Sequence, residues 1–105
     1  MGEYRISISD TAKQDIRDAV AYLKYNLQEP VIAEKTAKKI LDAISTLEDM
    51  PERIGTVNDE YLAERQIRGL QVKNYTAFFR IDEFGKSVEV VRVLHSRRDW
   101  ATLLR

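Results

Sequence analysis

Two stretches with helical apolar spacing follow each other in the first half of the chain, separated by only about three residues. Their apolar positions are Ala12, Ile16, Ala19, Val20, Leu23 and Leu27, then Ala33, Ala37, Ile40, Leu41, Ile44 and Leu47. Asp10 or Thr11 is the expected N-cap of the first helix, because Thr11 and Gln14 have the spacing of a capping box. Pro30 suits the first turn of the second helix, where its missing N–H needs no partner. Two long helices joined by so short a link run antiparallel, so the sequence predicts a helical hairpin.

Strand-like alternation occurs on both sides of this hairpin. Ahead of it, polar residues alternate with Tyr4, Ile6 and Ile8. After it, strand-like segments cover residues 67–72, 75–81 and 88–95, with short turns between them. Short turns join antiparallel neighbours, which predicts a three-stranded meander. On the last strand, strict alternation would place Val88, Val90, Arg92 and Leu94 on one face and Glu89, Val91, Val93 and His95 on the other.

The remaining segments complete a single α+β domain over residues 1–105. Residues 51–66 show no clean period and are predicted to be a surface loop. Ser96, with Asp99 three residues later, is expected to cap a short C-terminal helix. That helix is expected to fold back on the sheet through Trp100, Leu103 and Leu104. The predicted order is an N-terminal strand, the antiparallel two-helix hairpin, the three-stranded antiparallel meander and the short C-terminal helix.

The composition excludes several kinds of site. The chain has no cysteine and only one histidine, so disulfides, thiolate metal sites and multi-histidine metal centres are impossible. No metal and no small-molecule cofactor are therefore expected. The apolar runs are short, and the first residues contain no charged segment followed by an apolar one. We therefore expect a cytoplasmic protein that does not contact a membrane.

The net charge of zero conceals an asymmetry along the chain. Residues 1–64 carry 8 Lys and Arg against 13 Asp and Glu, whereas residues 65–105 carry 9 against 4. A chain that is neutral overall lacks the field of a protein that coats DNA. A local basic surface near the C-terminus can still dock on RNA phosphates or on an acidic peptide.

The end of the last strand contains the leading candidate site. The only histidine, His95, is followed by Arg97 and Arg98, and a titratable ring beside two permanent cations suits a phosphate or an acidic partner. The arginines also precede a helix N-terminus, where positive charge is mildly unfavourable and a docked anion is stabilised. Structural roles remain open: His95 could bond a neighbouring carbonyl or stack on Trp100, and the arginines could be exposed first-turn residues.

Three segments in this order resemble the RelE/ParE superfamily of toxins from bacterial type II toxin–antitoxin modules. They are YRISIS at residues 4–9, RGLQVKNY at 68–75 and RVLHSRRDW at 92–100, and the resemblance covers nearly the whole chain. It implies a growth-arresting toxin that is neutralised by a cognate antitoxin. The antitoxin's acidic, amphipathic tail is expected to pack across the helical hairpin and to reach Arg68, His95 and Arg97.

The superfamily contains two activities, and one of them would make this chain an enzyme. RelE-like members cut ribosome-bound mRNA, which needs a base, an acid and cations around the phosphate. His95 as base or acid, with Arg68 and Arg97, is the candidate catalytic set. The candidate binding residues are Arg68, Lys73, Arg80, Arg97 and Arg98. An alternative role for Arg68 is an ion pair with a carboxylate of the loop.

One departure from the nucleolytic pattern favours the other activity, which is inhibition of DNA gyrase by ParE-like members. The nucleolytic members carry an arginine after the first aromatic or histidine of the third strand, whereas here Thr76 follows Tyr75. Threonine cannot replace a guanidinium on a phosphate, so that charge is missing unless Arg68 or Arg80 supplies it. The resemblance therefore favours a ParE-like gyrase inhibitor over an mRNA endoribonuclease, and an interaction module without toxicity is a third possibility.

Overall fold

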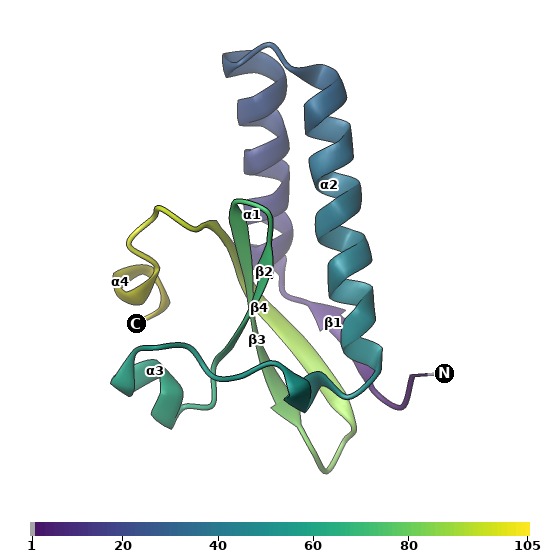
Figure 1. Ribbon diagram of the computed structural model, residues 1–105, viewed down its shortest axis with the longest axis vertical. Helices are drawn as coiled ribbons and strands as arrows, with labels where there is room; N and C mark the ends of the chain where they lie inside the picture. Colours follow the sequence, from purple (N-terminus) through teal and green to yellow (C-terminus); the bar gives the residue numbers. More distant parts are fainter. Residues whose placement is uncertain (1) are drawn as a thin grey trace.

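The computed structural model describes residues 2–105 and places two layers of helices around one sheet (Figure 1). Its elements are β1 (Arg5–Ile8), α1 (Asp10–Ala21), η1 (Tyr22–Asn26), α2 (Pro30–Ser45), η2 (Thr46–Glu48), η3 (Pro51–Arg53), α3 (Glu60–Glu64), β2 (Arg68–Val72), β3 (Tyr75–Asp82), β4 (Ser87–His95) and α4 (Trp100–Leu104). The predicted α+β order of strand, hairpin, meander and C-terminal helix is confirmed. The end of the helical hairpin that joins η1 to α2 projects well beyond the sheet (Figure 1).

The four strands form one sheet in the order β1-β4-β3-β2. β1 runs parallel to β4, whereas β2, β3 and β4 are antiparallel neighbours. Between β3 and β4 the register shifts, because Phe79 pairs with Val90 while Phe78 pairs with Arg92. Val91 is the extra residue of this β-bulge, and a bulge changes which face the following side chains occupy.

The bulge overturns the strict alternation expected for the last strand. Val90 and Val93 both pack on the hairpin side, and Val91 and Leu94 both pack on the opposite side. The expected grouping of Val90 with Leu94 on one face is therefore wrong. A side-chain period of two holds only while the ladder is uninterrupted.

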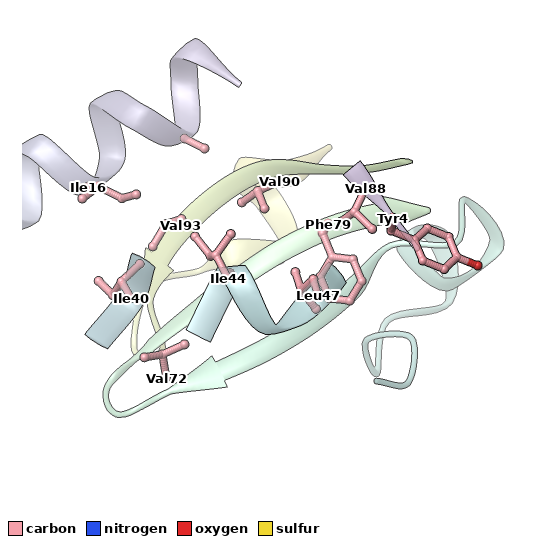
Figure 2. Packing of buried hydrophobic residues seen from close by; sticks show 12 residues of the cluster. Tyr4, Ile16, Ile40, Ile44, Leu47, Val72, Phe79, Val88, Val90 and Val93 are labelled. Carbon is pink, nitrogen blue, oxygen red and sulfur yellow. The ribbon is translucent and has the colours of Figure 1, made fainter. Parts of the chain in front are cut away.

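The main core lies between the helical hairpin and the sheet (Figure 2). Ile40 and Ile44 of α2 point at the sheet, with Ile16 of α1 beside them. On the sheet side, the buried contacts come from Val72, Ala77, Phe79, Val88, Val90 and Val93. Most of the two apolar stripes thus cover the sheet, but Leu27 and Leu41, which belong to the predicted stripes, are 50% and 47% exposed.

A smaller core covers the opposite face of the sheet. Phe78 of β3 and Leu94 of β4 pack against Leu62 and against Trp100, whose ring centroid lies 5.4 Å from that of Phe78. Leu62 belongs to α3 and is buried, so the prediction of a surface loop over residues 51–66 is wrong for this segment. A helix of five residues is too short to show a period in the sequence.

Ser9 caps α1, so the expected cap at Asp10 or Thr11 is wrong. The Ser9 hydroxyl accepts the Ala12 N–H at 3.0 Å and donates to the Val91 carbonyl, also at 3.0 Å. The same side chain therefore begins the helix and ties it to the bulge of β4.

Asp99, not Ser96, caps α4. Its carboxylate accepts the Thr102 N–H at 3.4 Å and the Thr102 hydroxyl at 2.8 Å. The helix is also held from its far end, where Arg105 pairs with Asp59 at 3.1 Å. Trp100 and Leu104 pack on the sheet as expected, but Leu103 points away and is exposed.

Candidate functional site

A groove with a volume of about 660 Å³ lies where the projecting hairpin meets the upper end of the sheet. Its apolar lining includes Ala19, Leu23, Leu27, Ile32 and Val93. Its aromatic and charged lining includes Tyr22, Tyr75, His95, Lys73, Arg98 and Asp15. A concave apolar surface with a few polar groups is the usual form of a binding site.

The end of the hairpin next to the groove exposes large apolar side chains. Five of them are between 47% and 69% exposed, namely Tyr22, Tyr25, Leu27, Val31 and Ile32. Within this end of the hairpin, η1 is a π-helical turn after which the Leu27 N–H donates to the Tyr22 carbonyl at 3.1 Å. π-turns inside α-helices occur often at functional sites. The groove and the hairpin end together form an apolar surface of the kind that proteins use for partners.

His95 lines the groove, and one of its two ring nitrogens already accepts a hydrogen bond. Its Nδ1 atom accepts the Arg97 N–H at 3.1 Å. The ring packs edge-on against Tyr75, with centroids 5.3 Å apart, rather than on Trp100. A ring nitrogen that accepts a hydrogen bond has its lone pair occupied. In this conformation Nδ1 of His95 is therefore not free to take up a proton.

Arg68 lies at the end of β2 that is farther from the groove. Its Nη1 atom donates to the carbonyls of Glu52, at 3.2 Å, and Ile54, so it holds η3 against β2. Arg68 is opposite Phe79, and His95 is opposite Tyr75. These register positions are separated by roughly 13 Å along β3, at about 3.3 Å per residue. The expected carboxylate partner of Arg68 is replaced by two backbone carbonyls.

The other candidate cations divide between the groove and the rest of the surface. Lys73 and Arg98 line the groove together with His95. Arg80 instead pairs with Glu89 at 2.9 Å on the open face of the sheet, and both side chains are about half exposed. The Arg97 side chain is exposed and does not line the groove. The structure therefore brings together Lys73, His95 and Arg98 and leaves Arg68 and Arg80 apart from them.

The Thr76 side chain belongs to a neutral hydrogen-bond network. Its hydroxyl lies 3.3 Å from Gln71 Oε1 and 3.3 Å from Ser96 Oγ, and Gln71 Nε2 donates to Ser96 Oγ at 2.9 Å. These three residues join β2, β3 and the segment after β4 without using a charge. Thr76 thus has a structural role at the position where the nucleolytic pattern has a guanidinium.

One charged pair at the groove was not predicted from the sequence. Asp15 of α1 accepts hydrogen bonds from Arg92 Nε at 2.8 Å, from Arg92 Nη2 at 3.0 Å and from the Val93 N–H at 2.9 Å. This pairing raises the pKa of the Arg92 guanidinium. One feature of the sequence points to such a pair: Arg92 stands within the apolar run of the last strand. Such a residue needs a buried partner.

Two kinds of feature are absent from residues 2–105. No three His, Asp or Glu side chains lie close enough together to hold a metal ion. No helix in the same range is long and apolar enough to cross a membrane.

Known proteins resemble this chain in sequence family and in fold. The chromosomal ParDE toxin–antitoxin system from P. aeruginosa contains a chain that superposes with a TM-score of 0.73, at 18% identity over 89% of this chain and 96% of that one. The RelBE2 toxin–antitoxin complex from Mycobacterium tuberculosis gives 0.62, at 22% identity over 90% and 93%. None of the curated proteins matches. The family model described as the ParE toxin of the type II toxin–antitoxin system parDE matches residues 6–100, so the chain belongs to the ParE toxin family.

Proposed function

We propose that this type II toxin arrests growth by binding DNA gyrase and not by cutting mRNA. The observation that carries the proposal is the separation of Arg68 from His95 along the sheet. Cleavage by a 2′-hydroxyl needs a base and a cation on the same phosphate. The match to the ParE family model supports the same target.

Two further features support a non-nucleolytic activity. The Nδ1 atom of His95 is occupied by the Arg97 N–H, so this nitrogen is not free to take up a proton in this conformation. Thr76 contributes a neutral hydroxyl that is already hydrogen-bonded to Gln71. RNA cleavage is the second candidate, because Lys73, His95 and Arg98 line one groove and could contact a phosphate there.

The test is to produce the chain in bacteria without its antitoxin and to measure two signals in the first minutes. We expect a DNA-damage reporter to rise while amino-acid incorporation into protein continues, because a trapped gyrase breaks DNA before it affects translation. Prompt loss of incorporation with a silent reporter would instead identify mRNA as the target. Normal growth with neither signal would identify a non-toxic interaction module. Both candidate targets lie in the cytoplasm.

We also propose that the cognate antitoxin is the partner that covers the groove and the exposed hairpin end. Two observations support this proposal. The hairpin end exposes large apolar side chains, and the groove beside it is lined by the cations Lys73 and Arg98. An amphipathic helix with an acidic side fits that combination.

Changing both Leu27 and Ile32 to aspartate is expected to weaken antitoxin binding at least about tenfold, because buried apolar anchors carry most of the energy of such interfaces. Binding is measured by titration calorimetry, with Met50→Asp as the control. Met50 is 66% exposed and lies outside the groove. Equal loss of affinity in the control, or no loss in the double variant, would place the antitoxin elsewhere.

A further inference from the structure

The turn between β3 and β4 presents Phe84 to solvent in a fixed position. The Phe84 side chain is fully exposed, more so than any other large apolar side chain in residues 2–105. The turn around it is ordered by Asp82, whose Oδ1 atom accepts the N–H groups of Phe84 at 3.1 Å and Gly85 at 3.2 Å. Glu83 accepts the Tyr4 hydroxyl at 3.0 Å, and Tyr4 is a buried member of the main core. An apolar side chain on a turn that is tied to the core is preorganised for a partner, because little conformational freedom is lost on binding.

A second exposed apolar side chain, Met50, lies near this turn. The Tyr4 backbone N–H donates to the Glu48 carbonyl at 3.1 Å, so the segment after α2 is tied to the same residue as the turn. Met50 belongs to that segment, is 66% exposed and has a φ of 44°, in the left-handed region that a side chain of its size rarely adopts. Residues held in such a conformation cluster at functional sites. Aromatic residues and methionine are also enriched in protein interfaces.

A hollow of about 520 Å³ adjoins the turn. Asp82 and Ser87, the residues at which β3 ends and β4 begins, both line it. The rest of its polar lining consists of Ser7, Arg80 and Glu89. The apolar ring is thus bordered by a polar recess, which is the arrangement of anchor and rim found at protein interfaces.

The charges around the exposed phenyl ring favour a protein partner over nucleic acid. Two carboxylates, Asp82 and Glu83, directly precede it and carry the same charge as a phosphate backbone. The cations of the turn are already engaged. The Lys86 ammonium lies 5.1 Å from the centre of the Tyr4 ring, and Arg5 donates to a backbone carbonyl of the turn at 3.4 Å. No free positive charge in this turn is therefore available to hold a phosphate.

The turn and the groove lie at opposite ends of β3 and β4 (Figure 1). Tyr75 pairs with His95 beside the groove, whereas Asp82 pairs with Ser87 beside the turn. These register positions are separated by roughly 23 Å along β3, at about 3.3 Å per residue. A partner in the groove therefore leaves Phe84 uncovered, and substitutions can separate the two surfaces.

We propose that the toxin contacts its protein target through a surface formed by Phe84, Met50 and the adjoining hollow, with the phenyl ring in an apolar pocket of the target. We call this the turn surface. The identity of the target rests on the proposed function, which names gyrase. Target and antitoxin then bind at opposite ends of the sheet, and the antitoxin neutralises the toxin by steric conflict with gyrase and not by covering Phe84.

The first test measures binding of purified gyrase holoenzyme to the parent chain and to Phe84→Gln, with Leu41→Gln as the matched control. Leu41 is also exposed, at 47%, but lies on α2 and outside the groove lining. We expect Phe84→Gln to lower the affinity for gyrase at least about tenfold and Leu41→Gln to leave it unchanged. Both variants should keep the melting temperature of the parent, because neither side chain belongs to a core. Equal gyrase affinity in the parent and Phe84→Gln would overturn the proposal.

The second test induces the same variants without antitoxin and measures the affinity of each purified protein for the antitoxin. Phe84→Gln is expected to lose growth arrest while it binds the antitoxin as tightly as the parent does. Weaker antitoxin binding by Phe84→Gln would overturn the separation of the two surfaces. A short DNA duplex and phosphatidylglycerol vesicles are titrated in parallel, and a Phe84-dependent affinity for either that exceeds the affinity for gyrase would also overturn the proposal.

Failure of the proposed function is distinguishable from failure of the turn surface. If the parent chain does not bind gyrase, the proposed function is wrong, and growth arrest by Phe84→Gln decides the turn surface. Full arrest by this variant would then overturn the turn surface as well. Loss of arrest, with antitoxin binding intact, would support the turn surface as the contact for a different protein target.

Discussion

Asp15→Ala is expected to lower the free energy of unfolding by about 3 kcal/mol, which is measured by urea denaturation at neutral pH. The Asp15 side chain is only 11% exposed and accepts three hydrogen bonds, two from Arg92 and one from the Val93 N–H. Its removal leaves a guanidinium and a backbone donor without an acceptor. Because 23% of the Arg92 side chain remains in contact with water, we expect a value at the lower end of the range for buried pairs.

The controls separate the ion pair from the backbone bond. Arg92→Met removes the cation but leaves Asp15 bonded to the Val93 N–H, so it should cost less than Asp15→Ala. Asp15→Asn keeps an acceptor for that N–H and should fall between the two. If Asp15→Ala and Arg92→Met cost the same, the backbone bond contributes nothing. A cost below about 1 kcal/mol for Asp15→Ala would mean that the pair behaves as a surface salt bridge.

The arrangement of this fold was predictable where local patterns determine it. The two helices follow from apolar stripes of 3.6-residue period, and the meander follows from alternation with short turns. Features that depend on distant residues were not predictable in this way. Ser9 caps α1 partly because its hydroxyl reaches Val91, which lies 82 positions away in the chain. The bulge at Val91 likewise appears only when β3 and β4 are aligned.

Part of the candidate site could also be predicted from the sequence, whereas the contacts that depend on strand register could not. The groove brings together three predicted residues, His95, Lys73 and Arg98. They lie close because the β2–β3 turn and the C-terminal end of β4 are at the same end of the sheet. Arg68 was grouped with them from residue type alone, but the register places it opposite Phe79. Asp15 and Arg92 are 77 positions apart, so no local pattern pairs them. Residue types indicate which chemistry is available, whereas strand register decides which groups meet.

Phe78→Ala is expected to lower the free energy of unfolding by about 4 kcal/mol and also to shift the fluorescence of the folded protein. Phe78 is 1% exposed and lies in the smaller core with Leu62 and Trp100. Trp100 is the only tryptophan in the chain, so its emission reports the position of α4. Loss of the phenyl ring removes the surface on which the indole packs, so the emission maximum should move to longer wavelength before denaturant is added.

Phe79→Ala is the matched control, because the two phenylalanines are adjacent on β3 and point to opposite faces of the sheet. Phe79 is 0% exposed and packs in the main core beneath the helical hairpin. Its loss should cost about as much, 3–5 kcal/mol, yet leave the native emission of Trp100 unchanged. If both variants shift the emission equally, the two faces of the sheet loosen together and α4 is not an independent unit. If only Phe78→Ala shifts it, the position of α4 depends on the smaller core and not on the main core.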